Sequence, residues 1–546
     1  MPVVASGPPS RSDHCPRSVL WLFFFVGVLR GIPFLATRVM NAPTGASFLP
    51  VGYLPKDFLQ YLGFIRQAGH ADGVLLSNPF TTDPQQPSFI LLFHTALGLL
   101  GRVSSIPPEW MLELSRIPLL LLLAHAFWRL LQTMGYSHRT SRLACLLYAL
   151  GGGVEWLAHA VGDQLSEPVL QAVRQNTWSM YGWSGFASFF NPLWIASLVI
   201  GFHLLRITLD RVSPVPARAV WVFALFLTLF WTHPYSAVAF GSIFGCQVMF
   251  AAVLQERPYF RSVLLLSVSA AAAALVSFYL VSLQLRDPVF STTSSGIFGT
   301  QGVSVVWYPL TLGLLLPMAV VAWRKHTFRN RAFLGSWLMA VVLLHTSYRL
   351  NGYHFVFYLA PAIAILCAPV AERLLAIPRG PAVAGWVRLL VGVLLLFANS
   401  LIQTATATND TLQTFFVSSE TAAIVERLGR EPAGNVFCPP VVGNILPAVS
   451  DHSVYVGHWF MTPSFRSREQ TYERAARGLM GTLELGNVLQ ANRIDYIVLP
   501  NAQASSFLDG TGNGVLVQKF STLSLARVRR TGSTSPPFES RSRSSN

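Results

Sequence analysis

The residue best suited to acid–base chemistry is Asp57, which stands in the first hydrophilic segment of the chain. In the run that follows, 58–65, the large apolar residues are spaced so that they share one face of a helix. A carboxylate at the start of such a helix can serve as a general base toward a hydroxyl group. It is also typical of a helix N-cap, which is the simpler interpretation from the residues alone, and the two roles are compatible.

A second group of polar residues stands in the short segment 345–355, between two apolar runs. Its Arg349, Asn351 and His354 suit a phosphate group, because a guanidinium can bind phosphate oxygens through paired hydrogen bonds. His233 opens another polar stretch at the end of an apolar run. The alternative is that Arg, His and Tyr side chains at such ends only anchor the chain at a membrane interface.

Several known catalytic motifs are missing from the sequence. It contains no GxxxxGK[ST] phosphate loop, no GxGxxG after a strand, no HExxH and no GxSxG. The five cysteines are scattered, without a CxxC pair or a Cys/His spacing that would suit zinc. The sequence therefore argues against an ATP-driven pump, a zinc protease and a disulfide-stabilised domain.

The elements that position these residues must be membrane helices. The chain has 546 residues, of which 52% are hydrophobic and only 12% are charged, against roughly 25% charged residues in ordinary globular proteins. So few polar side chains cannot cover a soluble protein of this length, and a chain this apolar is not disordered. A protein with many membrane-spanning helices is the class that remains.

About eleven apolar runs approach the ~20 residues that a helix needs to cross the membrane. They are 19–38, 113–133, 143–161, 191–209, 219–232, 234–254, 261–283, 304–323, 332–347, 353–370 and 382–403. A further run, 88–106, is interrupted by His94 and Arg102. When it is left at the membrane surface, the short loops that carry Lys and Arg all fall on one side, as the positive-inside rule requires. We therefore expect a cytoplasmic N-terminus and a surface helix at 88–106, and the net charge of +15 needs no nucleic-acid partner.

These patterns predict a fold that is mainly α, a polytopic bundle of transmembrane helices with a small external α/β domain at the C-terminus. Short buried strands are expected at GNVFCPP, SVYVGHW and DYIVLP, with helices at 467–479 and 482–491 between them. The expected parts are a cytoplasmic N-terminal segment (1–18), a transmembrane domain (19–403) whose external first loop (39–112) contains surface helices, an external α/β domain (404–530) and a disordered tail (531–546).

Three segments carry a resemblance to a known family. They are KDFLQYLGFIRQA with the following NPFTTDP (78–84), HPYSAVA from His233, and GNILPAVSDHSVYVGHWFMTP (443–463). With the order of a first span, an acidic external loop, about ten more spans and a C-terminal α/β domain, the chain resembles the GT-C glycosyltransferases over most of its length. That superfamily includes oligosaccharyltransferases, protein O-mannosyltransferases and the lipid A aminoarabinose transferase. More closely, the chain is similar to bacterial integral membrane proteins of this type.

The resemblance implies an inverting glycosyltransferase of the bacterial inner membrane, which moves a sugar from a polyprenyl-phosphate-linked donor to a glycan, lipid or protein acceptor at the outer face. Asp57 falls on the family's first-loop acidic residue, the catalytic base, and Asp83 falls near its second first-loop element. The candidate substrate-binding residues are Lys56, Asp83, His233, Arg349, Asn351 and His354. The cofactor stays open. A divalent metal ion is the candidate, but many members carry a paired acidic motif where this chain has Lys56 beside Asp57.

Two other functions stay open from the residues alone. A transporter or flippase of lipid-linked substrates predicts helices that are broken by Gly or Pro near mid-membrane. Gly151, Gly152 and Gly153 with Glu155 are the hint in its favour. A non-catalytic membrane assembly protein predicts no cavity between the first external loop and the outer helix ends.

Overall fold

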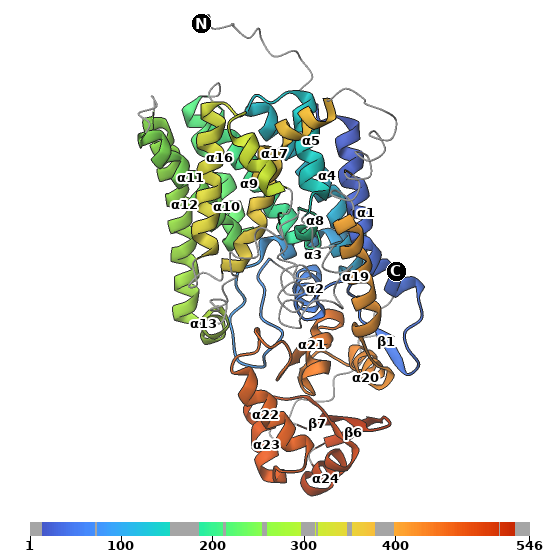
Figure 1. Ribbon diagram of the computed structural model, residues 1–546. Coiled ribbons are helices and arrows are strands. Elements are labelled where there is room, and N and C mark those ends of the chain that lie inside the picture. Colours follow the sequence, from blue (N-terminus) through green and yellow to red (C-terminus); the bar gives the residue numbers. More distant parts are fainter. Residues whose placement is uncertain are drawn as a thin grey trace, which may run out of the picture.

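The computed structural model describes residues 14–70, 74–152, 185–210, 214–253, 259–295, 312, 315–346, 352–376, 392, 398–512 and 514–529. Figure 1 shows long helices side by side in a bundle, with a smaller domain of helices and strands beyond one end of it. The chain is thus a multi-pass membrane protein with a mainly α fold and a small C-terminal α/β domain, as the sequence predicts.

The bundle consists of helices that overlap the predicted apolar runs and of two short ones, at 185–188 and 288–295, that do not. They are α1 (Arg17–Val39), α4 (Pro108–Thr133), α5 (His138–Leu150), α8 (Gly185–Ser188), α9 (Pro192–Leu209), α10 (Val215–Thr232), α11 (Pro234–Val253), α12 (Tyr259–Arg286), α13 (Pro288–Ser295), α15 (Leu315–Trp323), α16 (Phe328–His345), η4 (Gly352–Tyr358), α17 (Leu359–Ala376) and α19 (Asn399–Thr414). Among the described residues, 7 helices are long and apolar enough to cross a membrane, and each corresponds to a predicted run. Of the other predicted runs, 332–347 corresponds to α16, whereas 143–161, 304–323 and 382–403 extend outside the described residues.

Proline sets where several of these helices begin. The helices α4, α9 and α10 each have a proline in the first turn, where a backbone N–H has no partner inside the helix. Asn191 caps α9, because its side chain accepts a hydrogen bond of 3.0 Å from the backbone N–H of Leu193. Along α12 the outward side chains stay apolar, with Phe278 76% and Leu285 83% exposed, as expected for a helix that faces lipid.

The first loop forms two shorter helices at the end of the bundle nearer the small domain (Figure 1). The helix α2 (Pro55–His70) confirms the predicted amphipathic helix, and α3 (Leu92–Ser104) lies within the predicted surface segment 88–106. At 13 residues, α3 is about 20 Å long, which is less than the ~30 Å of membrane hydrocarbon. Strand β1 (Ala46–Phe48) of the same loop pairs antiparallel with β2 (Phe416–Ser418), which joins the loop to the C-terminal region.

The C-terminal domain is built on a 5-stranded sheet with the strand order β4-β3-β5-β7-β6. Its elements are α20 (Ser419–Gly429), β3 (Asn435–Phe437), α21 (Pro440–Val449), β4 (Ser453–Val454), α22 (Phe465–Ala476), α23 (Thr482–Ala491), β5 (Tyr496–Pro500), α24 (Asn501–Thr511), β6 (Gly514–Lys519) and β7 (Leu523–Val528). Strand β3 is parallel to β4 and β5, whereas β7 is antiparallel to β5 and β6.

The three strands and two helices predicted for this domain are all present, as β3, β4, β5, α22 and α23. The hairpin of β6 and β7 was not expected, nor were α20, α21 and α24. The helix α19 continues past the expected domain boundary at 404, because it packs along α1 and ends only where β2 begins.

Candidate functional site

Asp57 lies in the first turn of α2, where the bundle meets the C-terminal domain. Its side chain is 39% exposed, and its Oδ1 atom lies 3.7 Å from Nε2 of His458, whose side chain is 1% exposed. An N-cap residue stands just before the first residue of a helix. Because α2 begins at Pro55, Asp57 stands inside the first turn and is not the N-cap. The positive end of the helix dipole favours a carboxylate there. The site therefore begins with a partly exposed carboxylate beside a buried imidazole.

The helix α2 is held from two directions, by α3 of the first loop and by α21 of the C-terminal domain. Phe58 and Leu62 are each 1% exposed, so the helix is anchored by its apolar side. The contact with α3 is so close that a Cβ atom added to Gly98 would lie 2.4 Å from the carbonyl oxygen of Ile65. These contacts fix the backbone of the turn that carries Asp57.

His458 comes from the segment that follows β4, and two glycines bring that segment against α21. A Cβ atom added to Gly443 would lie 2.0 Å from the carbonyl oxygen of Val456, and one added to Gly457 would lie 2.4 Å from the carbonyl oxygen of Gly443. Real Cβ atoms do not come this close to backbone atoms, so both positions require glycine. Since α21 packs on α2, this approach places His458 next to Asp57.

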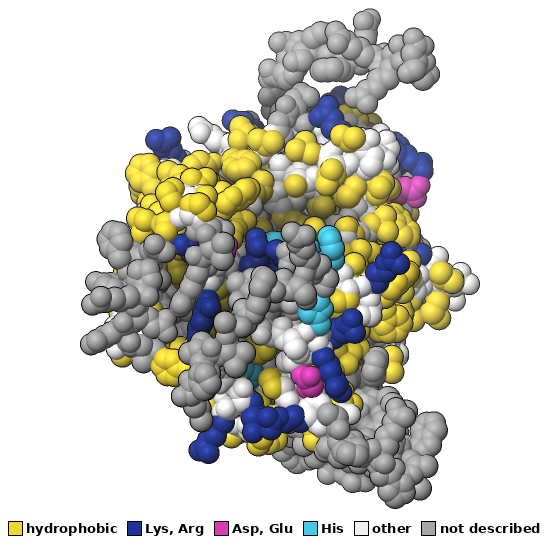
Figure 2. All heavy atoms as spheres, turned by 90° about the horizontal axis from the view of Figure 1, so that it is seen from above, with side chains coloured by type: hydrophobic (Ala, Val, Ile, Leu, Met, Phe, Trp, Pro, Cys, Tyr) yellow, Lys and Arg dark blue, Asp and Glu magenta, His cyan; other side chains and the backbone are white. Residues whose placement is uncertain are grey.

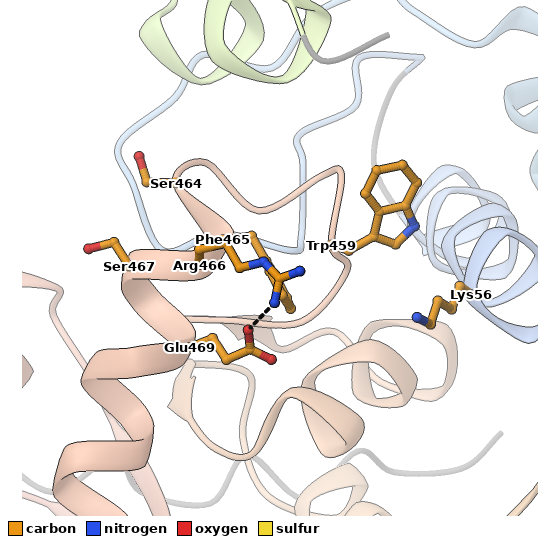
Figure 3. A pocket seen from close by; sticks show the side chains of 7 residues that line it. All are labelled: Lys56, Trp459, Ser464, Phe465, Arg466, Ser467 and Glu469. Carbon is orange, nitrogen blue, oxygen red and sulfur yellow. Dashed lines mark ion pairs between the residues drawn. The ribbon is translucent and has the colours of Figure 1, made fainter. Parts of the chain in front are cut away.

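A cavity of about 790 Å³ opens beside these residues. Its lining consists of Lys56, Trp459, Ser464, Phe465, Arg466, Ser467 and Glu469. Figure 3 shows Lys56 and Trp459 on one side and the first turn of α22 on the other. The indole of Trp459 is 55% exposed, and Arg466 forms an ion pair of 3.5 Å with Glu469. Lys56 and Trp459, which line the cavity, are the chain neighbours of Asp57 and His458.

Asp83 forms an ion pair with the C-terminal domain. Both of its carboxylate oxygens accept hydrogen bonds of 2.6 Å from Nη2 of Arg468. Arg468 also donates to the carbonyl oxygen of Tyr455 at 3.0 Å. This geometry places Asp83 at a contact between the first loop and α22, the helix whose first turn lines the cavity.

His233 lies at the junction of α10 and α11 and is buried. Its Nδ1 atom is 2.6 Å from Oγ of Ser236, which in turn donates to Ser197 at 2.8 Å. Ser236 also bonds to the hydroxyl of Tyr358, at the end of η4. His354 belongs to η4, but its side chain lies outside the described residues, as do Arg349 and Asn351 altogether. His233 is therefore linked through Ser236 to Tyr358 of η4, the helix to which His354 belongs.

Two buried arginines lie next to the start of α2. Arg30 of α1 donates to the carbonyl oxygen of Phe186 at 2.6 Å, and Arg116 of α4 donates to that of Phe190 at 2.8 Å. Arg116 also forms an ion pair with Glu113, and both side chains are buried. The arginines thereby fix the segment 186–190, whose Phe190 ring packs 6.1 Å from that of Phe58.

Burial controls the ionisation of the groups between α2 and α3. The pKa of His94 is lowered to about 3 by its burial, so this histidine is neutral and adds no charge near Asp57. Its ring centroid lies 4.7 Å from that of Tyr61, with the two rings tilted by 39°. Burial also raises the pKa of Tyr61, and the nearby Asp57 raises it further, while a hydrogen bond with Asn191 opposes the shift.

The described residues contain no group of three or more His, Cys, Asp and Glu side chains that could hold a metal ion. At the site itself, Asp57 and His458 form a pair of potential metal ligands.

The structure adds three residues to the site that were not predicted from the sequence, His458, Trp459 and Arg468. The first two stand in the segment 443–463, which carries part of the resemblance.

No protein-family model matches the chain, and no curated protein matches it. Several solved structures are similar in fold. The apo oligosaccharyltransferase of Archaeoglobus fulgidus has a TM-score of 0.50 and 11% identity, over 88% of this chain and 69% of that chain. Apo ArnT from Cupriavidus metallidurans has a TM-score of 0.50 and 14% identity, over 94% of this chain and 98% of that chain. The same ArnT bound to undecaprenyl phosphate has a TM-score of 0.49 at 15% identity, over 93% of this chain and 98% of that chain.

Both proteins are GT-C glycosyltransferases, so the chain has the GT-C fold that its sequence led us to expect. At these identities the likeness shows the fold and leaves the reaction to be argued from the site.

Proposed function

We propose that this protein is a membrane glycosyltransferase that moves a sugar from a polyprenyl-phosphate-linked donor to an acceptor hydroxyl. The observation that carries this proposal is the place of Asp57. It is a partly exposed carboxylate on the first turn of α2, and its chain neighbour Lys56 lines a cavity between the first loop and the C-terminal domain of a GT-C fold. ArnT, a protein of this fold, is also crystallised bound to undecaprenyl phosphate.

In the proposed reaction, Asp57 accepts the proton of the acceptor hydroxyl as the oxygen attacks the anomeric carbon of the donor sugar. The bond between that carbon and the phosphate oxygen breaks, polyprenyl phosphate leaves, and the anomeric configuration inverts. We assign Arg349, Asn351 and His354 to the phosphate, with His233 supporting the same segment through η4. Cations at that place would stabilise the charge that develops on the leaving oxygen.

We also propose that the C-terminal domain lies outside the bacterial inner membrane. Figure 2 shows the opposite end of the bundle, where Lys and Arg side chains predominate over acidic ones among the coloured residues. Exposed Arg139, Arg324 and Lys325 lie in the loops and first turns at that end. By the positive-inside rule this end faces the cytoplasm. Asp57 would then act at the outer face, on a donor that needs no nucleotide-binding loop.

The test is a transfer assay with the purified full chain in lipid nanodiscs. A panel of radiolabelled polyprenyl-phosphate sugars is offered with cell-envelope glycolipids and glycans as acceptors, with and without EDTA. We expect one donor to release polyprenyl phosphate in an acceptor-dependent reaction, and loss of turnover in EDTA would establish a metal requirement. Translocation of a lipid-linked sugar across proteoliposomes without any transfer would instead identify a flippase.

We assign the cavity to the acceptor. Trp459→Ala should therefore raise the acceptor KM about 10-fold, because it removes one aromatic packing contact worth about 1.4 kcal/mol. The exposed indole offers a flat apolar surface, and Ser464 and Ser467 offer hydroxyls, a combination that suits a sugar ring. The acceptor KM, donor KM and kcat are measured in the assay above.

The matched control is Trp459→Phe, which keeps a ring and should keep the acceptor KM within about threefold. An Ala variant that raises the donor KM, with the acceptor KM unchanged, would move the acceptor out of this cavity.

A further inference from the structure

We infer that His458 is a positioning residue that holds the Asp57 carboxylate in place for the reaction, an assignment that rests on the proposed function. The histidine comes from the C-terminal domain and the carboxylate from the first loop, so the site is complete only when these two parts are docked.

The two ring nitrogens of His458 have different roles. Nδ1 lies 3.3 Å from the backbone nitrogen of Phe460 and 3.1 Å from that of Met461, and both N–H groups donate to it. A nitrogen that accepts two hydrogen bonds carries no hydrogen of its own, so the ring proton of the neutral imidazole is on Nε2. The backbone therefore selects the tautomer with its hydrogen on Nε2, the nitrogen that lies 3.7 Å from Oδ1 of Asp57.

The Nε2–H group is buried and, among the described residues, has no hydrogen-bond partner within normal distance. The facing carboxylate oxygen, Oδ1 of Asp57, is 3.7 Å away. A shift of about 0.7 Å would bring the pair into the usual N–H···O range of 2.7–3.2 Å. Catalytic hydrogen bonds are often long in substrate-free enzymes and shorten in the complex. The Asp57 side chain, at 39% exposed, is the partner that is free to move.

The backbone on either side of His458 is rigid. Thr462 donates its backbone N–H to the carbonyl oxygen of His458 at 2.9 Å, and its hydroxyl accepts from Gly457 at 3.1 Å. The same hydroxyl donates to the carbonyl oxygen of Phe80 at 2.8 Å, and Asn78 donates to that of Met461 at 2.6 Å. The first loop and the segment 457–462 thus hold each other, and the imidazole is a fixed donor.

This geometry separates positioning from proton transfer. The ring has no free lone pair to take a proton from the acceptor, because Nε2 carries hydrogen and Nδ1 is engaged by two N–H groups. A bond from Nε2–H to Oδ1 would leave Oδ2 of Asp57 and its lone pairs for the acceptor hydroxyl. Asp57 remains the base, and His458 sets the direction in which it points.

The first test compares His458→Ala with His458→Gln, whose amide nitrogen reaches the place of Nε2. We expect His458→Ala to lower kcat 10–100-fold, the usual range for a residue that orients a reacting group. The acceptor KM should stay within about twofold, and His458→Gln should recover most of kcat. The control is His452→Gln, a buried histidine of the same domain that bonds to Leu428 and Gly434 and should leave kcat near wild type.

The second test needs no turnover. Nitrogen-15 NMR of labelled imidazoles, with the His458 signal assigned by its loss in His458→Gln, should show the Nε2–H tautomer in the full chain. An Nδ1–H tautomer would overturn the inference, as would a wild-type kcat in His458→Ala alongside an inactive Asp57→Asn. If no donor is turned over by the wild type, the proposed function fails, and the tautomer still decides whether His458 is directed at Asp57.

Discussion

Asp57→Asn should lower the kcat of sugar transfer by about 10³-fold, within the 10²–10⁴-fold range that a positioned general base contributes. The substitution keeps the size of the side chain and an oxygen that can face His458 Nε2, but an amide cannot accept the acceptor's proton. The donor KM should change little, since Asp57 is assigned to the acceptor side of the reaction. The measurement is release of polyprenyl phosphate in nanodiscs at saturating donor.

The matched control is Asp451→Asn. Asp451 forms an ion pair of 3.1 Å with Arg66, which belongs to the same helix α2, and its side chain is 50% exposed. Exposed pairs of this kind contribute about 1 kcal/mol or less, so the control should keep kcat within about twofold. If Asp57→Asn retained a tenth or more of the wild-type kcat, another group would have to be the base.

The parts of this site that the sequence predicts are those with a local pattern. The amphipathic run 58–65 predicts α2, and an acidic residue just before it directs attention to Asp57. Alternating or continuous apolar runs predict β3, β4 and β5 in the same way. A buried strand needs apolar residues at successive or alternate positions, and this pattern is visible within a few residues. Such signals need no knowledge of the partner elements.

The contacts between distant segments leave no such pattern. The pairs Asp57 with His458 and Asp83 with Arg468 each join the first loop to the C-terminal domain. Their geometry depends on the close approach of Gly443 and Gly457, which reads in the sequence only as two isolated glycines. A glycine beside a histidine predicts nothing by itself, so the role of His458 required the tertiary structure.

The second large effect is expected in the bundle, at Arg116. Its guanidinium pairs with Glu113 inside α4, and the side chains of the two are 1% and 7% exposed. Glu113 and Arg116 stand three residues apart, so a helix over this run brings them together, but the sequence does not indicate the contact with the backbone of Phe190. Charged residues buried in membrane spans are rare, and they pair with each other or with carbonyl oxygens. Arg116 does both, with Glu113 and with the carbonyl oxygen of Phe190.

Arg116→Met should destabilise the folded protein by about 3–5 kcal/mol, because it leaves the Glu113 carboxylate buried without its partner. It also removes the donor to the carbonyl oxygen of Phe190, so the segment that packs against Phe58 loses one of its two arginine contacts. The free energy of unfolding is measured in detergent micelles with a chemical denaturant. Arg66→Met is the comparison, since its half-exposed pair with Asp451 should be worth about 1 kcal/mol or less.

The double variant Glu113→Leu with Arg116→Met separates the charge from the hydrogen bond. Removing both charges relieves the unpaired carboxylate, so the double variant should be more stable than Arg116→Met alone. It should still fall short of the wild type by about 1–3 kcal/mol, because the Phe190 carbonyl oxygen remains without its donor. A double variant as unstable as the single one would mean that the backbone contact, and not the ion pair, dominates the role of Arg116.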